Sequence, residues 1–397
     1  MFEFPNTFKR EYTDYITKKP LGKFIQAHKL DGITSNSHRA DIINAITFFA
    51  NTNADNEEIV DQWLDESIRS GKRDIYIKLL SLSENDKNNL KSDSYVQNHL
   101  IDYLPDNQNR HISKNRYDYT YKCVSYSINN TEYGIRVSIL ECRLIKTESG
   151  SKEILPVICD IFVDKSVIIL RIKPVSDAWD EDENGNLKKI TINKEAEKVI
   201  SDITNKLDIV LMADGLLSYA GLKHKLYNMM KKYIETPKEI QDKIDLNREK
   251  INNISKIIQQ QICNVDESYE KDILLDVQNL VEKYIAISQP DKQIFTKDKE
   301  DYPVMLAAKD EEESFVKQEA ALKEPLQMKA VFYDNKKMII KNKKCDGIMF
   351  AIKGKKNGKE FVAKYEVRTK GCVVKFYEYV EEEDSNAAIF SFLDSEE

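Results

Sequence analysis

Two segments of the sequence share one arrangement of residues that could carry out chemistry. Each has a Cys-Asp pair, an apolar run, a turn, and a second apolar run with charged residues near its end. The first segment carries Asp160 and Arg171, and the second carries Asp346, Glu366 and Arg368. Two short apolar runs joined by a turn predict a β-hairpin. Carboxylates on such strands can hold a divalent cation that polarises a phosphodiester and activates water. Ordinary β-meanders have the same pattern, so both interpretations stay open.

Over about 25 residues the second segment resembles the core of the PD-(D/E)xK nuclease-like families. In those families an Asp opens one strand, and an acid followed two residues later by Lys ends the next. The resemblance implies that Asp346 and Glu366 bind Mg²⁺ or Mn²⁺, with Glu319 on a short predicted helix as a third ligand. Arg368 stands where the catalytic Lys belongs, and Lys370 is its nearest substitute. Arginine is too basic to help generate a nucleophile.

The first segment matches the same pattern incompletely. Asp160 and Lys173 match, but Arg171 stands where the second metal-binding acid belongs. Two incomplete matches in one chain indicate that the pattern arises easily from meanders. A degenerate nuclease-like sheet that binds nucleic acid is therefore favoured over an active nuclease, and the sequence favours a non-enzyme.

Charge segregation is the second signal. Residues 336–375 contain thirteen lysines and arginines and three acidic residues, whereas the whole chain has a net charge of −7. A local positive field on a sheet attracts phosphates and gives salt-dependent binding. The alternative is a merely solvated lysine-rich face. The predicted nucleic-acid contacts are Lys353, Lys355, Lys356, Lys359, Lys364, Arg368 and Lys370.

Other signatures of catalysis or metal binding are missing from the sequence. It contains no phosphate-binding glycine loop of the G-x-x-x-x-G-K-[ST] or G-x-G-x-x-G type. The five histidines have no metal-ligand spacing, and each is interpreted as a surface or packing residue. The six cysteines form no C-x-x-C pair and are interpreted mainly as buried thiols. Arg110, His111, Lys114 and Arg116 form a small basic loop that could contact a second phosphate.

The helices and strands that the sequence predicts around these residues indicate an α+β fold, in which a helical region separates antiparallel β-meander blocks. The stretch 74–80 is interpreted as a strand within the helical N-terminal region. Alternating patterns predict four meander strands, at 118–126, 132–146, 153–163 and 165–173. We expect the Lys, Glu and Thr positions of these strands to face water. The predicted order is a helical region at 1–116, the meander at 117–192, a helical region at 193–288, a linker with a short helix at 289–328, and a basic sheet with a frayed acidic tail at 329–397.

Residues 237–288 predict a long antiparallel helical hairpin. Thr236-Pro237 starts its first helix, in which Ile244, Ile251 and Ile258 recur every seven residues. Such a pair either packs on its own domain or projects as an arm for self-association or a protein partner.

Length and composition place these elements in a globular chain. There is no run of the roughly 20 apolar residues that a membrane helix needs, and the N-terminus lacks the layout of a secretory signal. We therefore expect a cytoplasmic protein with no membrane contact. The favoured function is nucleic-acid binding within an oligomer or multiprotein assembly, possible roles being prokaryotic genome maintenance or antiviral defence. The alternatives are a Mg²⁺- or Mn²⁺-dependent nuclease and a structural subunit that binds partners through 237–288.

Overall fold

The chain folds into two compact units. The computed structural model describes residues 1–9, 15–104, 106, 108–114, 123–150, 152–181, 185–212, 216–297, 299–309, 315–320, 323–355, 358–368 and 371–395. The first unit contains residues 1–218 and 370–386, and the second contains residues 219–369 and 387–397. Both units combine helices with an antiparallel sheet, so the predicted α+β class is confirmed.

The first unit is built on an antiparallel sheet with the strand order β13-β1-β5-β4-β3-β6-β7, in which β2 also pairs with β3 and β8 with β1. The predicted strand at 74–80 is confirmed as β1, and three predicted meander strands are confirmed as β3, β4 and β5. The first predicted strand, 118–126, overlaps β2 from Cys123 onward, and residues 118–122 lie outside the described residues. The bounds are β1 Asp74–Ser81, β2 Cys123–Thr131, β3 Gly134–Lys146, β4 Lys152–Phe162, β5 Val167–Ile172, β6 Trp179–Glu181, β7 Leu187–Lys189, β8 Val210–Leu211 and β13 Gly371–Phe376.

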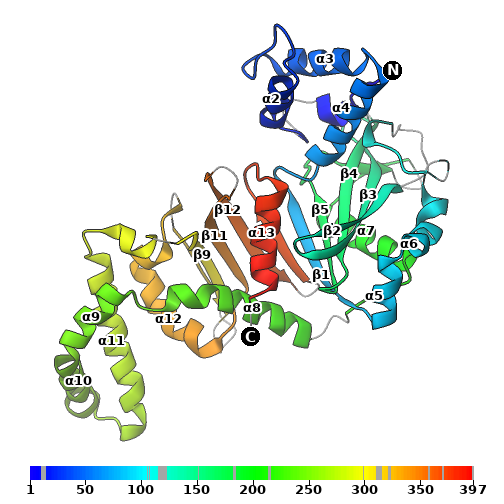
Figure 1. The fold of residues 1–397 in the computed structure, drawn as a ribbon. Helices are drawn as coiled ribbons and strands as arrows, with labels where there is room; N and C mark the ends of the chain where they lie inside the picture. Colours follow the sequence, from blue (N-terminus) through cyan, green and yellow to red (C-terminus); the bar gives the residue numbers. More distant parts are fainter. Residues whose placement is uncertain are drawn as a thin grey trace. The chain divides into compact units, whose positions relative to one another are not determined.

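Helices surround this sheet (Figure 1). The short α1 contacts β4, and the amphipathic α7 contacts β5, which is why every residue of β5 is buried. The helices of the first unit are α1 Asn6–Lys9, α2 Lys18–Ala27, α3 Arg39–Ala50, α4 Ala54–Ser67, α5 Glu84–Lys91, α6 Asp93–Leu100 and α7 Ile192–Lys206.

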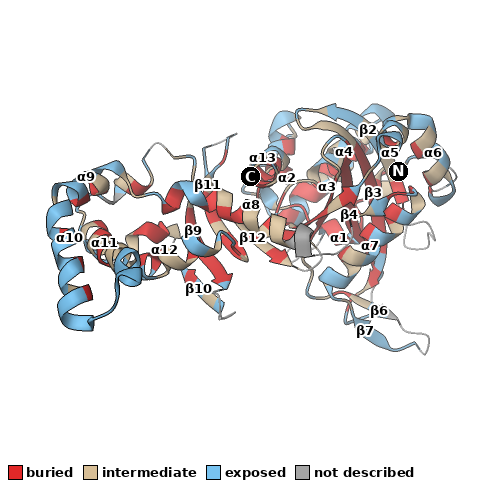
Figure 2. Cartoon of the chain, turned by 90° about the horizontal axis from the view of Figure 1, so that it is seen from below, coloured by how far each residue is buried: buried red, intermediate tan, exposed pale blue. Residues whose placement is uncertain are grey.

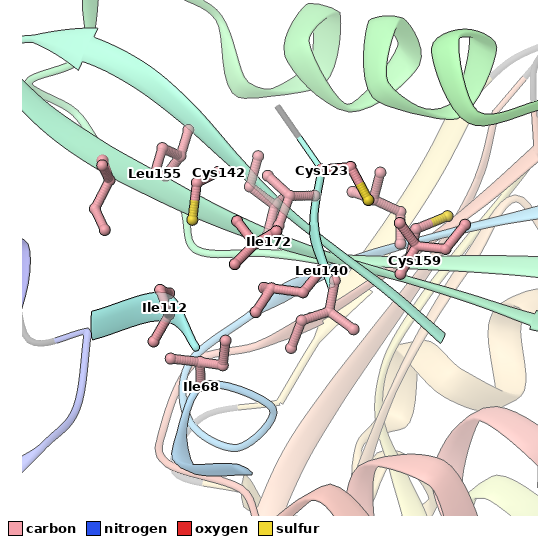
Figure 3. Close-up of a cluster of buried hydrophobic side chains, with 14 of the residues drawn as sticks. Ile68, Ile112, Cys123, Leu140, Cys142, Leu155, Cys159 and Ile172 are labelled. Atoms are coloured by element: carbon pink, nitrogen blue, oxygen red, sulfur yellow. The ribbon is translucent and has the colours of Figure 1, made fainter. Parts of the chain in front are cut away.

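The core of the first unit lies among these layers. It includes Cys123, Cys142 and Cys159, which behave as small apolar side chains beside Leu140, Leu155 and Ile172 (Figure 3). Five of the six cysteines are buried free thiols, as the sequence predicts, and Cys263 is exposed.

The predicted exposure of the Lys, Glu and Thr positions of the meander is wrong for Glu141, Glu153 and Lys173, which are buried. The charged residues Arg143 on β3, Asp160 on β4 and Arg171 on β5 are also buried. Each is held in an ion pair, which is the condition for burying a charge.

The second unit has a four-stranded antiparallel sheet in the order β10-β9-β11-β12. Phe350 and Tyr365 lie on its buried face against Tyr233 and Phe392. The strands are β9 Asp301–Lys309, β10 Phe315–Glu319, β11 Gly347–Lys353 and β12 Glu360–Arg368. The helices are α8 Leu216–Ile234, α9 Lys238–Leu246, α10 Arg248–Ile257, α11 Glu270–Ile287, α12 Ala330–Asn342 and α13 Glu382–Leu393, of which α8 from Tyr219 and α13 from Ala387 belong to this unit.

Three predicted elements of this region are wrong. Residues 301–309 form the buried strand β9 instead of a linker, since they pair with β11. Pro303 does not interrupt this strand, because it sits opposite the register shift at Met349/Phe350, a position that tolerates proline. Residues 315–319 form a strand instead of a helix, because they pair with β9. The acidic tail is helical instead of frayed, since α13 buries Ile389, Phe390 and Phe392.

The predicted helical hairpin is confirmed, with α9 and α10 packed against α11 (Figures 1 and 2). Ile244 and Ile251 are buried as predicted, but Gln259 is buried in place of Ile258. A π-helical segment, Ile258–Cys263, begins at this point, and its wider turn shifts which side chain faces α11. None of the helices in the described part of the chain is both long and apolar enough to cross a membrane.

Candidate functional site

The C-terminal hairpin sends its two candidate carboxylates to opposite faces of the sheet. Gly347 on β11 is the direct partner of Glu366 on β12, and the ladder continues with the Val367 N–H donating to the Asp346 carbonyl at 2.9 Å. Neighbouring residues of a strand alternate between faces. Asp346 therefore lies on the face of Val367, and Glu366 on the other.

Each carboxylate is already held by cations of its own face. The Asp346 Oδ1 lies 2.5 Å from the Lys223 Nζ on α8, and the two side chains are only 16% and 13% exposed. Glu366 lies between its strand neighbours, 2.5 Å from the Lys364 Nζ and 3.0 Å from an Arg368 guanidinium nitrogen. Asp346 thus anchors a helix to the sheet, and Arg368 serves Glu366 instead of facing an open site.

Glu319 is not placed beside either carboxylate. It lies on the edge strand β10, opposite Met305, and pairs with Lys317 at 2.8 Å. It shares the face of Glu366, but β9 and β11 separate their strands, which corresponds to about 14 Å at normal strand spacing. A single ion needs ligand oxygens within roughly 5 Å of each other. The structure therefore does not bring Asp346, Glu366 and Glu319 together.

One group of exposed lysines lies at the turn between β11 and β12. Lys353, Lys355 and Lys359 are exposed, and the turn is closed by the Gly354 N–H donating to the Lys359 carbonyl at 3.0 Å. Gly358 has a positive φ of 63°, a backbone conformation that favours glycine. The predicted contacts Lys356 and Lys370 lie outside the described residues.

Two further lysines, which the sequence did not indicate, extend this group. The Lys353 N–H donates to the Glu300 carbonyl at 2.8 Å, which brings Lys299 to the turn. The ammonium groups of Lys299 and Lys232 lie 5.1 and 4.9 Å from the ring centre of Tyr233. Burial and the nearby charge of Lys232 lower the pKa of Lys299. We call Lys232, Lys299, Lys353, Lys355 and Lys359 the basic turn cluster.

Acidic groups offset part of this charge. Asp301 accepts from Lys232 at 2.8 Å and from the Tyr233 hydroxyl, and Glu360 accepts from the Tyr302 hydroxyl at 2.8 Å. These carboxylates position Lys232 and the aromatic rings. Lys353, Lys355 and Lys359 of the turn itself are exposed.

The positive charge of 336–375 does not form one continuous face. Lys336 is buried against Glu282 of α11 at 2.7 Å, and Lys337 pairs with Asp276 of the same helix at 3.1 Å. Lys375 belongs to the first unit, because its strand β13 pairs with β1. Lys336 and Lys337 therefore brace the helical hairpin.

The N-terminal hairpin contains a closed ion-pair network instead of an open site. Asp160 on β4 is fully buried, contacts Arg171 on β5, and lies 3.2 Å from Arg69. Glu382 at the start of α13 accepts from Arg136 at 2.8 Å, and Asn386 accepts from Arg171. Burial alone would raise the pKa of Asp160, but the guanidinium groups of Arg69, Arg171 and Arg136 overcome it and lower that pKa to about 2.

The small basic loop before the meander is neutralised by acids. His111 and Lys114 contact carboxylates of α4, and Arg110 contacts Asp106. Arg116 lies outside the described residues. In the described part of this loop, up to Lys114, the basic residues are therefore compensated by acids.

Comparison with known proteins identifies no relative: no family model matches the chain, and no curated protein or solved structure is significantly similar to it.

Proposed function

We propose that this protein binds nucleic acid through the basic turn cluster and does not cleave it. The observation that carries the proposal is the exposure of Lys353, Lys355 and Lys359 at the connection between β11 and β12, with Lys232 and Lys299 nearby. Exposed ammonium groups close together in one segment suit phosphate contacts, which give affinity without reading sequence. The separation of Asp346 from Glu366 argues against a metal-dependent nuclease.

The rest of the predicted basic surface contributes less to this proposal. Lys364 and Arg368 are compensated by Glu366 and are only partly exposed. Lys353, Lys355 and Lys359 are more exposed than Lys364 and Arg368, so we assign Lys364 and Arg368 a weaker role.

The test is the salt dependence of binding to a labelled DNA duplex. The variant K353Q/K355Q/K359Q should bind more weakly, and its log–log salt slope should flatten by about 0.9 for every lysine–phosphate ion pair that the substitutions remove. The matched control K341Q/K343Q/K344Q removes three exposed lysines near the other end of β11 and should keep the slope. An unchanged slope in the turn variant, or a flattening only in the control, would place binding elsewhere.

A second candidate function is partner binding through the helical hairpin. Its solvent side exposes Leu246 at 84%, Ile262 at 71% and Leu280 at 53%. Ile251 is buried within the unit, so an acidic residue there would unfold the hairpin instead of separating subunits. L246S/L280S should convert an assembly to a smaller mass in light scattering if these side chains form an interface, and should leave the mass unchanged if they do not.

A further inference from the structure

The helix α4 presents acidic residues to a loop of the first unit. Glu58, Asp61 and Asp65 are three and four residues apart, which places them on one face of the helix. Opposite them lie His111 and the short 3₁₀ turn Ile112–Lys114. Ile112 is fully buried in the same core cluster as Ile68 at the end of α4 (Figure 3). Both sides of this junction are therefore fixed by the core.

The potential ligand atoms of Glu58, Asp61 and His111 all lie within 4.8 Å of one another. The His111 Nε2 is 3.3 Å from the Glu58 Oε1. Two atoms bound to one Zn²⁺ at about 2.0–2.2 Å can be up to roughly 4 Å apart. A small movement of the exposed Glu58 side chain would therefore bring the three ligand atoms within reach of one ion.

His111 is held in the orientation that a metal-binding histidine requires. Its Nδ1 lies 2.8 Å from the Asp65 Oδ2, while the Asp65 Oδ1 accepts the Ile112 N–H at 2.9 Å. A carboxylate on Nδ1 fixes the ring and its tautomer, leaving Nε2 for the ion, and metal-binding histidines are regularly supported in this way. The histidine comes from a separate segment, 46 residues from Asp65.

The charge around these atoms favours a cation. Glu57, Glu58, Asp61 and Asp65 face Lys114 and His111, with the Lys114 Nζ 3.1 Å from the Asp61 Oδ2 and in contact with Glu57. The Ser113 hydroxyl also donates to Asp61. Lys114 is 39% exposed, so its ammonium group can withdraw to Glu57 while an ion binds Asp61.

We propose that Glu58, Asp61 and His111 form a binding site for a divalent transition-metal ion of the Zn²⁺ type. One imidazole and two carboxylates favour such an ion over Mg²⁺, which prefers oxygen ligands alone. Three protein ligands leave a coordination position for water or another ligand. This site is independent of the nucleic-acid proposal, and it differs in place and in ligand type from the Mg²⁺ or Mn²⁺ site that the C-terminal hairpin predicted.

The test uses the full-length, tag-free protein after treatment with a chelator. Zn²⁺ added in a calorimetric titration should bind with one equivalent per chain, and Co²⁺ should give visible d–d absorption. E58Q changes an exposed side chain and should weaken Zn²⁺ binding by at least 10-fold, as should H111Q. D65N should cost about 10- to 100-fold by releasing the ring of His111.

The matched control is E66Q, which alters an exposed acid of α4 outside the cluster. It should bind Zn²⁺ with wild-type affinity, and Zn²⁺ should raise the Tm of wild type and E66Q but not of E58Q. Absence of binding would show that the cluster only ties the loop to α4 by ion pairs. Equal affinity in wild type, E58Q and H111Q would place the ion elsewhere. Either result overturns the proposal.

Discussion

The two Cys-Asp hairpins start from one sequence pattern and end with different chemistry. In β4–β5 the carboxylate of Asp160 is fully buried between Arg171 of its own hairpin and Arg69, 91 residues away. In β11–β12 the carboxylate of Asp346 meets one lysine of α8, and Glu366 is compensated by its own strand. The pattern determines the hairpin, whereas residues distant in sequence decide what its acid does.

The largest expected difference between the hairpins is in stability. Asp160→Asn should lower the free energy of unfolding by about 3–5 kcal/mol, because it leaves buried guanidinium groups without their counter-charge. Asp346→Asn should cost less, about 1.5–3 kcal/mol, because only one cation, Lys223, loses its counter-charge. Urea denaturation followed by circular dichroism measures both, and equal losses would contradict the contrast.

The pH dependence of stability should also distinguish the buried Asp160 network. The folded-state pKa of Asp160 is about 2, below the value of about 3.9 in an unfolded chain. Its network therefore stabilises the fold fully above about pH 4, and this contribution is lost as the pH falls from about 4 toward 2. Acid titrations of unfolding should be less steep over this interval in Asp160→Asn than in wild type. Parallel titrations would show that Asp160 is not the group responsible.

The smaller effect can be isolated by a double-mutant cycle. Lys223→Met and Asp346→Asn, alone and together, should give a coupling energy of about 1 kcal/mol, since the two groups are each other's ion-pair partner. Glu319→Gln combined with Lys223→Met provides the uncoupled control. A coupling near zero would mean that Asp346 does not anchor α8.

The alternation and repeats of apolar residues along the sequence predicted much of the fold. The turns and alternation gave β3, β4 and β5, and the seven-residue repeat gave the hairpin of α9, α10 and α11. What could not be predicted depends on pairing between distant segments. Strand β13 pairs with β1 at the partners Asp74 and Lys375, and nothing local to either strand specifies that choice.

The candidate site was predicted only in part, for the same reason. The exposed turn lysines follow from their own sequence, but Lys232 and Lys299 join them through contacts of Tyr233. The spacing of Glu58, Asp61 and Asp65 was a readable signal of an acidic helix face. Its histidine is far away in sequence, so a search for neighbouring metal ligands misses it.

The most direct test of the nucleic-acid proposal is incubation of the purified protein with labelled DNA and RNA, with EDTA or with Mg²⁺ or Mn²⁺. Retention and cleavage are scored in the same samples. We predict retention that survives EDTA and falls steeply with salt, with intact nucleic acid in every sample. Absence of retention, or metal-dependent cleavage that Asp346→Ala abolishes, would contradict the account.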